Sequence, residues 1–252
     1  MNESPPSKYK LIIAYDGTPF GGWQVQSNTS SIQTHVQTAL CTALRAKIDV
    51  TGAGRTDSGV HALEQCAHFS VAKVLDLHKL TRSLNGILPI EIRIKAIEKA
   101  RSDFHARYSA KSKIYRYHLH IKKTIDPFRR LYSYHLPYPI DLELLKKAKN
   151  HFIGEYDFTS FSNEAHRGCA SKNAIRILKR IDLIQQEDEI ILEFEANGFL
   201  YKMVRNIVGT LLDVARGKLP IDSIPEIFAA KDRQKAAATA PAHGLFLVKV
   251  IY

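Results

Sequence analysis

The sequence is poor in cysteine. Its 252 residues include three cysteines, and they are widely spaced: Cys41, Cys66 and Cys169. An odd number at such spacing argues against a disulfide framework and is typical of a reducing compartment. No Cys-x-x-Cys motif occurs, and His166 and Cys169 have no second pair of ligands nearby in the sequence, so a structural zinc site is not expected.

Long apolar runs are also missing. No uninterrupted hydrophobic stretch reaches the length needed to cross a membrane, and the first residues are polar, without the hydrophobic region of a signal peptide. We therefore expect a soluble cytoplasmic protein with no membrane partner.

Acidic residues are in the minority. Lys and Arg number 36 against 25 Asp and Glu, which gives a formal net charge of +11. The basic residues lie along the folded segments and form no terminal tail, which suits a groove built by the fold. Such a balance favours an anionic partner, nucleic acid or a membrane surface, although charge alone also fits an ordinary soluble basic protein.

Apolar and polar residues alternate in several short segments, and others have helical spacing. Strands are expected at residues 8–15, 48–51, 65–71, 90–98, 113–121, 174–184, 189–197 and 245–251. Helices are expected after an N-cap at Ser31, and at residues 76–86, 141–152, 200–216 and 224–230, with Asp141 as a further N-cap and Gly217 ending the fourth.

This order predicts an α+β fold made of two similar halves. Each half is expected to have an antiparallel sheet with helices packed on one face, and the active site is expected in the cleft between the halves. The boundary divides the chain into an N-terminal half, 1–105, and a C-terminal half, 106–252.

Residues Gly52 to Ala62 read Gly-Ala-Gly-Arg-Thr-Asp-Ser-Gly-Val-His-Ala and hold one carboxylate, Asp57, among three glycines. Val60-His61 stands where a P-loop requires Lys-Ser/Thr, and Asp57 stands where a dinucleotide fingerprint requires its third glycine. Asp57 and His61 would supply only two metal ligands. No nucleotide, redox or metal cofactor is therefore predicted. Two interpretations remain: an ordinary turn, or a lone catalytic carboxylate that a nearby cation keeps ionised.

Further motifs identify a family. They are Tyr15–Gln24, Gly54–Ala62, Asp103–Ala110, Tyr115-Arg-Tyr117, Gly154–Phe161, Lys202–Gly209 and Ala236–Leu245. In this order, and covering nearly the whole chain, they resemble the TruA family of tRNA pseudouridine synthases. Ser58 is one departure, because many members have Ala at this position.

The resemblance implies an isomerase that converts uridine to pseudouridine at positions 38 to 40 of the tRNA anticodon arm. It implies no cofactor, a homodimer, and tRNA as partner. Asp57 corresponds to the essential carboxylate, Tyr115 to an active-site tyrosine that stacks on uracil, and Arg205 to the ion-pair partner of Asp57. Whether Asp57 attacks the ribose or acts as a base stays open.

The resemblance also implies residues that contact the RNA. Besides Tyr115, these are Arg55, Arg107 and Arg116, with further candidates for phosphate contacts at Arg101, Lys111, Lys113, Arg129, Arg130, Arg167, Lys172 and Arg176. Two alternatives remain open: a pseudouridine synthase acting on another RNA, and a non-catalytic RNA-binding protein on the same fold.

Overall fold

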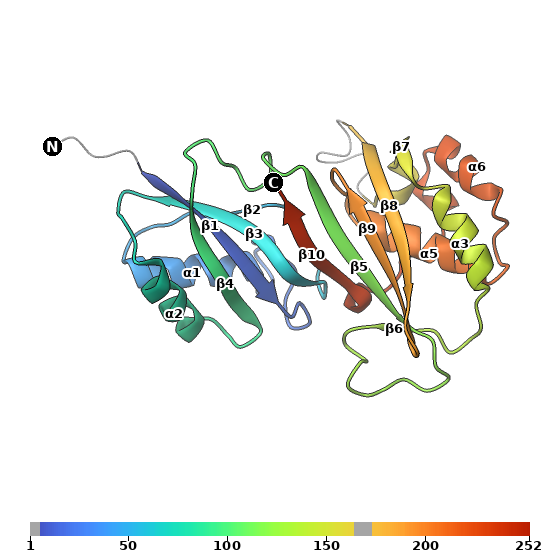
Figure 1. Cartoon of the computed structure of the whole chain (residues 1–252), viewed down its shortest axis with the longest axis horizontal. Coiled ribbons are helices and arrows are strands. Elements are labelled where there is room, and N and C mark those ends of the chain that lie inside the picture. The colour runs from blue at the N-terminus through green and yellow to red at the C-terminus, as the bar shows by residue number, and fades with distance from the viewer. Residues whose placement is uncertain (1–5, 164–172) are drawn as a thin grey trace. The chain divides into compact units, whose positions relative to one another are not determined.

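The computed structural model describes residues 6–163 and 173–252 (Figure 1). His166, Arg167, Cys169 and Lys172 lie outside these residues. The chain divides into two compact units, Met1–Lys111 with Phe246–Tyr252, and Ser112–Leu245. Each unit combines strands with helices, which confirms the predicted α+β class. Within the described ranges, no helix is long and apolar enough to cross a membrane.

The first unit is built on a sheet with the strand order β4-β1-β3-β10. Its strands are β1 (Ser7–Tyr15), β2 (Thr51–Gly52), β3 (His61–Val71), β4 (Ile92–Ala100) and β10 (Leu245–Ile251). β1 pairs antiparallel with β3 and β4, and β2 pairs with β3. β10 runs parallel to β3, with Phe246 opposite His61. The β-forming residues 8–15 predicted this strand, and every second residue of β1 from Tyr9 onward is buried.

Two helices complete the first unit, α1 (Ile32–Leu44) and α2 (Leu77–Ile87). The predicted N-cap is confirmed, because the Ser31 hydroxyl accepts a hydrogen bond from the Thr34 N–H at 3.2 Å. Apolar residues of α1 and α2 are buried, and α2 packs beside β4. The amphipathic pattern of these segments therefore supplies the core of the unit.

The second unit has the strand order β5-β9-β8-β7, with β6 parallel to β5. Its strands are β5 (Ser112–His120), β6 (Tyr134–His135), β7 (Gly154–Asp157), β8 (Ile175–Gln185) and β9 (Glu189–Ala196). Its helices are α3 (Leu142–Asn150), α5 (Met203–Ala215) and α6 (Ser223–Ala230), with 3-10 turns at Thr159–Phe161, Arg233–Lys235 and Ala242–Gly244.

Helix ends in this unit follow the expected signals. The Asp141 carboxylate accepts from the Leu144 N–H at 2.9 Å, which confirms this N-cap. Gly217 has φ +69° just beyond α5, as expected of a residue that ends a helix in the left-handed conformation. Most of α5 is buried, so this helix forms the centre of the unit's core.

Three features differ from the sequence-based expectation. The strand expected at 48–51 is the short β2 at Thr51–Gly52. The predicted half 106–252 included the last strand, whereas β10 pairs with β3 and belongs to the first compact unit. β6 and β7 were not predicted, because two and four residues are too few to display a period of two.

Candidate active site

Asp57 lies in a loop formed by residues 53–60, between β2 and β3. The loop closes in a tight turn, in which the Val60 N–H donates to Asp57 O at 3.1 Å. Gly59, the third residue of this turn, has φ +76°, a conformation that favours glycine. Asp57 is half-buried at the head of the turn. The motif extends past the loop, since His61 and Ala62 already belong to β3 and pair with β10.

The loop before α1 supports the backbone around Asp57. The Trp23 N–H donates to Thr56 O at 3.1 Å. Gly22 has φ +95°, and a Cβ at this position would lie 2.5 Å from Thr56 O and 2.9 Å from Asp57 C. Glycine is needed here because the two backbones lie in direct contact.

Side chains reinforce the same contact. The Ser58 hydroxyl donates to Phe20 O at 3.1 Å. A Cβ on Gly52 would lie 2.5 Å from the Trp23 indole, which is 2% exposed. Gly52 therefore admits the buried tryptophan, and the Phe-Gly-Gly-Trp segment and the glycine-rich loop fit together as one assembly.

Buried polar groups anchor the loop before Asp57. The Tyr15 and Thr56 hydroxyls share a hydrogen bond of 2.8 Å, and Gln65 Nε2 donates to Gly54 O at 3.0 Å. Burial raises the pKa of Tyr15 to about 12, against the opposing effect of its hydrogen bonds. The phenol therefore stays neutral. These bonds hold Asp57 in a fixed backbone, which a reacting carboxylate requires.

His61 belongs to the support of the loop. Its side chain is 1% exposed, and its ring stacks on Phe246 with centroids 4.5 Å apart. Nδ1 accepts from the Gly17 N–H at 3.1 Å and lies 3.1 Å from Asp16 Oδ1. A ring enclosed in this way positions the neighbouring backbone at Gly17.

Tyr115 lies on β5 in the second unit. It stands opposite Phe194 of β9 and packs edge-to-face on Phe199, with ring centroids 5.0 Å apart. Tyr117 projects from the same face of the strand, two residues on. Its hydroxyl donates to Pro241 O at 2.7 Å. Burial raises the pKa of Tyr117 well above the ordinary value, so it remains a neutral donor.

Arg205 lies in the first turn of α5 and is half-buried. Its Nε donates to Ala240 O at 2.8 Å, and the Ala240 N–H donates back to Arg205 O at 3.1 Å. Pro241, which binds Tyr117, is the next residue. The segment before β10 thus links the Arg205 helix to the face of β5 that carries Tyr115.

A buried network that the sequence did not reveal fixes this segment on α5. Asn206, fully buried, donates from Nδ2 to Phe161 O at 2.7 Å. Its Oδ1 accepts from Arg233 Nη2 at 3.0 Å and from the Thr239 hydroxyl at 2.7 Å. Arg233 Nη2 also donates to the Thr239 hydroxyl at 2.9 Å. In the sequence, only the place of Asn206 next to Arg205 in the Lys202–Gly209 motif could have pointed to this network.

Gly209 allows the same segment to lie close to α5. A Cβ at Gly209 would lie 1.9 Å from Ala238 O, a distance that no side chain permits. Residues 236–240 therefore pack directly on the helix backbone, which explains why the motif needs a glycine in a buried helix despite its low helix propensity.

The predicted RNA-contacting arginines have different surroundings. Arg55 is exposed, directly before the turn that holds Asp57. Arg107 is exposed and its guanidinium carbon lies 5.7 Å from the centre of the Tyr108 ring. Arg116 is partly exposed, and its Nε donates to Glu193 Oε2 at 2.6 Å.

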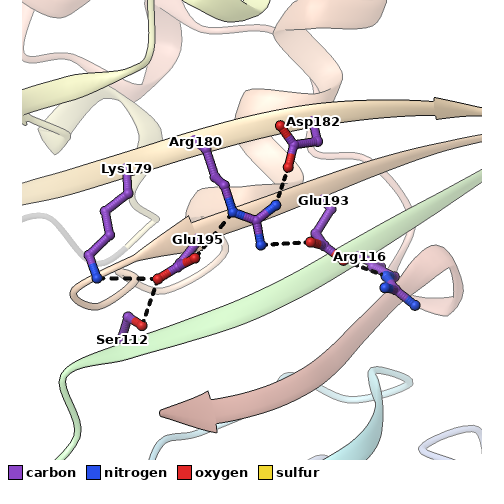
Figure 2. Close-up of polar contacts among 7 residues, drawn as sticks. All are labelled: Ser112, Arg116, Lys179, Arg180, Asp182, Glu193 and Glu195. Atoms are coloured by element: carbon purple, nitrogen blue, oxygen red, sulfur yellow. Dashed lines mark hydrogen bonds and ion pairs between the residues drawn. The ribbon is translucent and has the colours of Figure 1, made fainter. Parts of the chain in front are cut away.

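Arg116 belongs to a charged network across the strands β5, β9 and β8 of the second unit (Figure 2). The members are Ser112, Arg116, Lys179, Arg180, Asp182, Glu193 and Glu195. Burial opposes ionisation of Glu193, yet hydrogen bonds from Arg116 and Arg180 hold its pKa below the ordinary value. The network joins β5, β9 and β8, so Arg116 bridges strands as well as facing solvent.

Comparison with known proteins gives concordant results. A family profile described as tRNA pseudouridine synthase matches residues 11–109 and 148–252. A protein of Protochlamydia amoebophila named tRNA pseudouridine synthase A 1 is 56% identical over 245 residues, which cover 97% of this chain and 96% of the relative.

Two further relatives extend the likeness. A Bacillus cereus protein, also named tRNA pseudouridine synthase A 1, is 45% identical and covers 97% of this chain and 98% of the relative. A Limosilactobacillus reuteri protein named tRNA pseudouridine synthase A is 41% identical and covers 97% of this chain and 96% of the relative. The chain therefore belongs to the tRNA pseudouridine synthase family.

Proposed function

We propose that this enzyme isomerises uridine to pseudouridine at positions 38 to 40 of the tRNA anticodon arm, with Asp57 as the reacting carboxylate. Membership of the tRNA pseudouridine synthase family supports the reaction and the substrate class. The observation that carries the assignment of Asp57 is its loop, whose backbone is held on both sides by Gly22, Trp23 and buried hydrogen bonds.

The reaction exchanges one bond to the ribose for another. The N1–C1′ bond breaks, uracil rotates, and a C5–C1′ bond forms, after which C5 loses its proton and N1 holds one. Asp57 enters as a carboxylate, either by attacking the ribose or by removing a ribose proton. Tyr115 stacks on the uracil, and Arg205 pairs with Asp57 to keep it ionised.

The target uridine must leave the RNA stack before it reaches Asp57. Extruding a base costs a few kcal/mol. Arg55, exposed beside the Asp57 turn, is suited to fill the vacated space or to bind the neighbouring phosphate. Arg107 and the outer nitrogens of Arg116 add backbone contacts, which position RNA without reading its sequence.

The proposed roles are divided between the two units. The first unit supplies the carboxylate, and the second supplies Tyr115 and Arg205. We further propose that the enzyme acts in the cytoplasm as a homodimer that binds tRNA, as the family resemblance implies.

The test uses unmodified tRNA transcripts with uridine at position 38, 39 or 40 alone, and one with cytidine at all three. Pseudouridine mapped at each single uridine, and none in the cytidine transcript, supports the proposal. Product at another tRNA position, or product only in a different RNA, overturns the positional assignment. A protein that binds tRNA but forms no pseudouridine overturns the catalytic assignment in favour of a binding protein.

Salt dependence tests the mode of RNA binding. Neutralising phosphates releases counterions, so tRNA affinity should fall linearly on a log–log plot as salt rises. A net charge of +11 leads us to expect a steep slope. An affinity that stays constant between 50 and 200 mM salt would contradict binding through basic residues.

A further inference from the structure

The segment 121–133 links β5 to β6. Arg129 and Arg130 of this segment are candidates for phosphate contacts, but the proposed chemistry at Asp57 uses none of its residues. We call the segment the basic arm. It has four basic residues against one acidic residue, and the basic ones are Lys122, Lys123, Arg129 and Arg130. Figure 1 shows the arm as a long loop that leaves the sheet of the second unit at the end of β5.

An aromatic side chain stands exposed among these charges. Phe128 is 87% exposed, and Tyr132 is 39% exposed. An exposed aromatic ring beside cations is the combination with which proteins bind unpaired nucleotides, because the ring stacks on a base while the cations contact phosphates.

Hydrogen bonds hold the arm that carries the exposed Phe128 in one conformation. His120 Nε2 donates to Thr124 O at 3.1 Å near the start, and His135 Nε2 donates to Lys122 O at 2.9 Å from the far end. Backbone hydrogen bonds form turns between these anchors. The arm therefore presents Phe128 in a defined conformation, which lowers the entropy lost when a partner binds.

Not all of the basic side chains are neutralised. Lys122 Nζ lies 2.7 Å from Asp188 Oδ1, in the turn between β8 and β9. Arg129 Nη1 lies 3.4 Å from Oε2 of Glu189, the first residue of β9. Within the described part of the chain, Lys123 and Arg130 have no carboxylate partner. These two charges remain available for an anion.

The length of β5 limits which nucleotides the arm can reach. His120 follows Tyr115 by five residues, and a strand rises about 3.3 Å per residue, so the arm begins about 16 Å from Tyr115. An arm that begins this far from Tyr115 is expected to contact a part of the RNA other than the base held at Tyr115.

We propose that the basic arm is a second tRNA-binding surface, on which Phe128 stacks on an unpaired base outside the target site. Lys123 and Arg130 bind phosphates beside that base. The identity of the RNA rests on the proposed function. The surplus of basic residues on the arm favours an anionic occupant. A second copy of this chain is the competing occupant.

Fluorescence gives a direct test. The sequence has one tryptophan, Trp23, which is 2% exposed, so Phe128→Trp adds a second and exposed fluorophore. Unmodified tRNA transcript should quench the added emission through base stacking. Val74→Trp is the matched control at a site 84% exposed in the first unit, and its emission should stay unchanged. Equal quenching of both variants, or of neither, overturns the proposal.

Kinetics give the second test. Phe128→Ala should raise KM for tRNA about 5- to 150-fold, the range for loss of one stacked base, with kcat at saturating tRNA unchanged. Phe128→Tyr should restore KM, and Phe128→Leu should not. An unchanged KM for Phe128→Ala overturns the proposal.

Two outcomes separate this proposal from its alternatives. If Phe128→Ala instead converts a dimer to a monomer in sedimentation experiments, the arm is a protein interface and the proposal is wrong. If the wild-type protein forms no pseudouridine, the proposed function fails, whereas quenching of Phe128→Trp by tRNA still reports on the arm alone.

Discussion

Replacing Gly22 by alanine perturbs the Asp57 loop without changing Asp57 itself. Gly22 has φ +95°, outside the conformations that residues with a Cβ prefer. The added Cβ would lie 2.5 Å from Thr56 O and 2.9 Å from Asp57 C. Ordinary contact begins at 3.4 Å, so the loop backbone must move by about 0.5–0.9 Å, the difference between these distances.

This displacement sets the expected size of the effect. A misplacement of about 1 Å in a reacting group can cost about 100-fold in rate, because the geometry of attack is lost. We expect kcat to fall about 100-fold. Positive φ and close contact together should destabilise the fold by about 1–3 kcal/mol, which leaves a domain of ordinary stability folded.

The assay measures pseudouridine formation at saturating unmodified tRNA, alongside thermal unfolding followed by circular dichroism. Gly86→Ala is the matched control, because no heavy atom lies within 4 Å of a Cβ at this position in α2. It should retain full kcat and gain about 0.5–1 kcal/mol of stability. A folded Gly22→Ala protein with wild-type kcat would refute the view that this contact positions Asp57.

The network beside Arg205 and a buried histidine yield the remaining predictions. Arg233→Lys removes the planar fork that binds Asn206 and Thr239, so kcat should fall at least about 10-fold at saturating tRNA, whereas exposed Lys235→Ala leaves it unchanged. Burial, helped by nearby positive charge, lowers the pKa of His68 to about 4, below the value of 6.5 for an unperturbed histidine. The unfolded chain therefore binds the proton first, and stability should fall by up to about 3 kcal/mol as pH drops from 6.5 to 4. Urea unfolding of wild type and His68→Gln should show a flatter pH dependence in the variant, and equal slopes would contradict this origin.

Features set by neighbouring residues could be predicted from the sequence. A run of β-forming residues at 8–15 indicated β1, and the N-caps Ser31 and Asp141 marked the starts of two helices. Each signal depends on residues within a few positions, which is why it can be read before the fold is known.

Features set by distant partners could not be predicted in this way. The return of β10 to β3 pairs Phe246 with His61, residues far apart in the chain. The sequence shows Gly52 only as one glycine of a glycine-rich stretch, whereas in the structure its lack of a Cβ makes room for the Trp23 indole. The bonds of Arg233 to Asn206 likewise depend on how segment 236–240 packs against α5.

The candidate active site also combines features that the sequence could predict with features that it could not. The family motifs indicated Asp57, Tyr115 and Arg205 by residue type, and these roles stay predictions. The sequence did not show what holds them: Gly22 and Trp23 against the Asp57 loop, and Ala240 against Arg205. Such supports are backbone contacts, and they leave little trace in side-chain chemistry.

The most direct test of the central claim is the rate of pseudouridine formation by Asp57→Asn on unmodified tRNA, with Ser58→Ala as the neighbouring control. Asparagine keeps the size of the side chain and removes its charge. The rate for Asp57→Asn should fall by about 100-fold or more while tRNA binding persists, and Ser58→Ala should remain active. Wild-type rates of pseudouridine formation by Asp57→Asn would contradict the account.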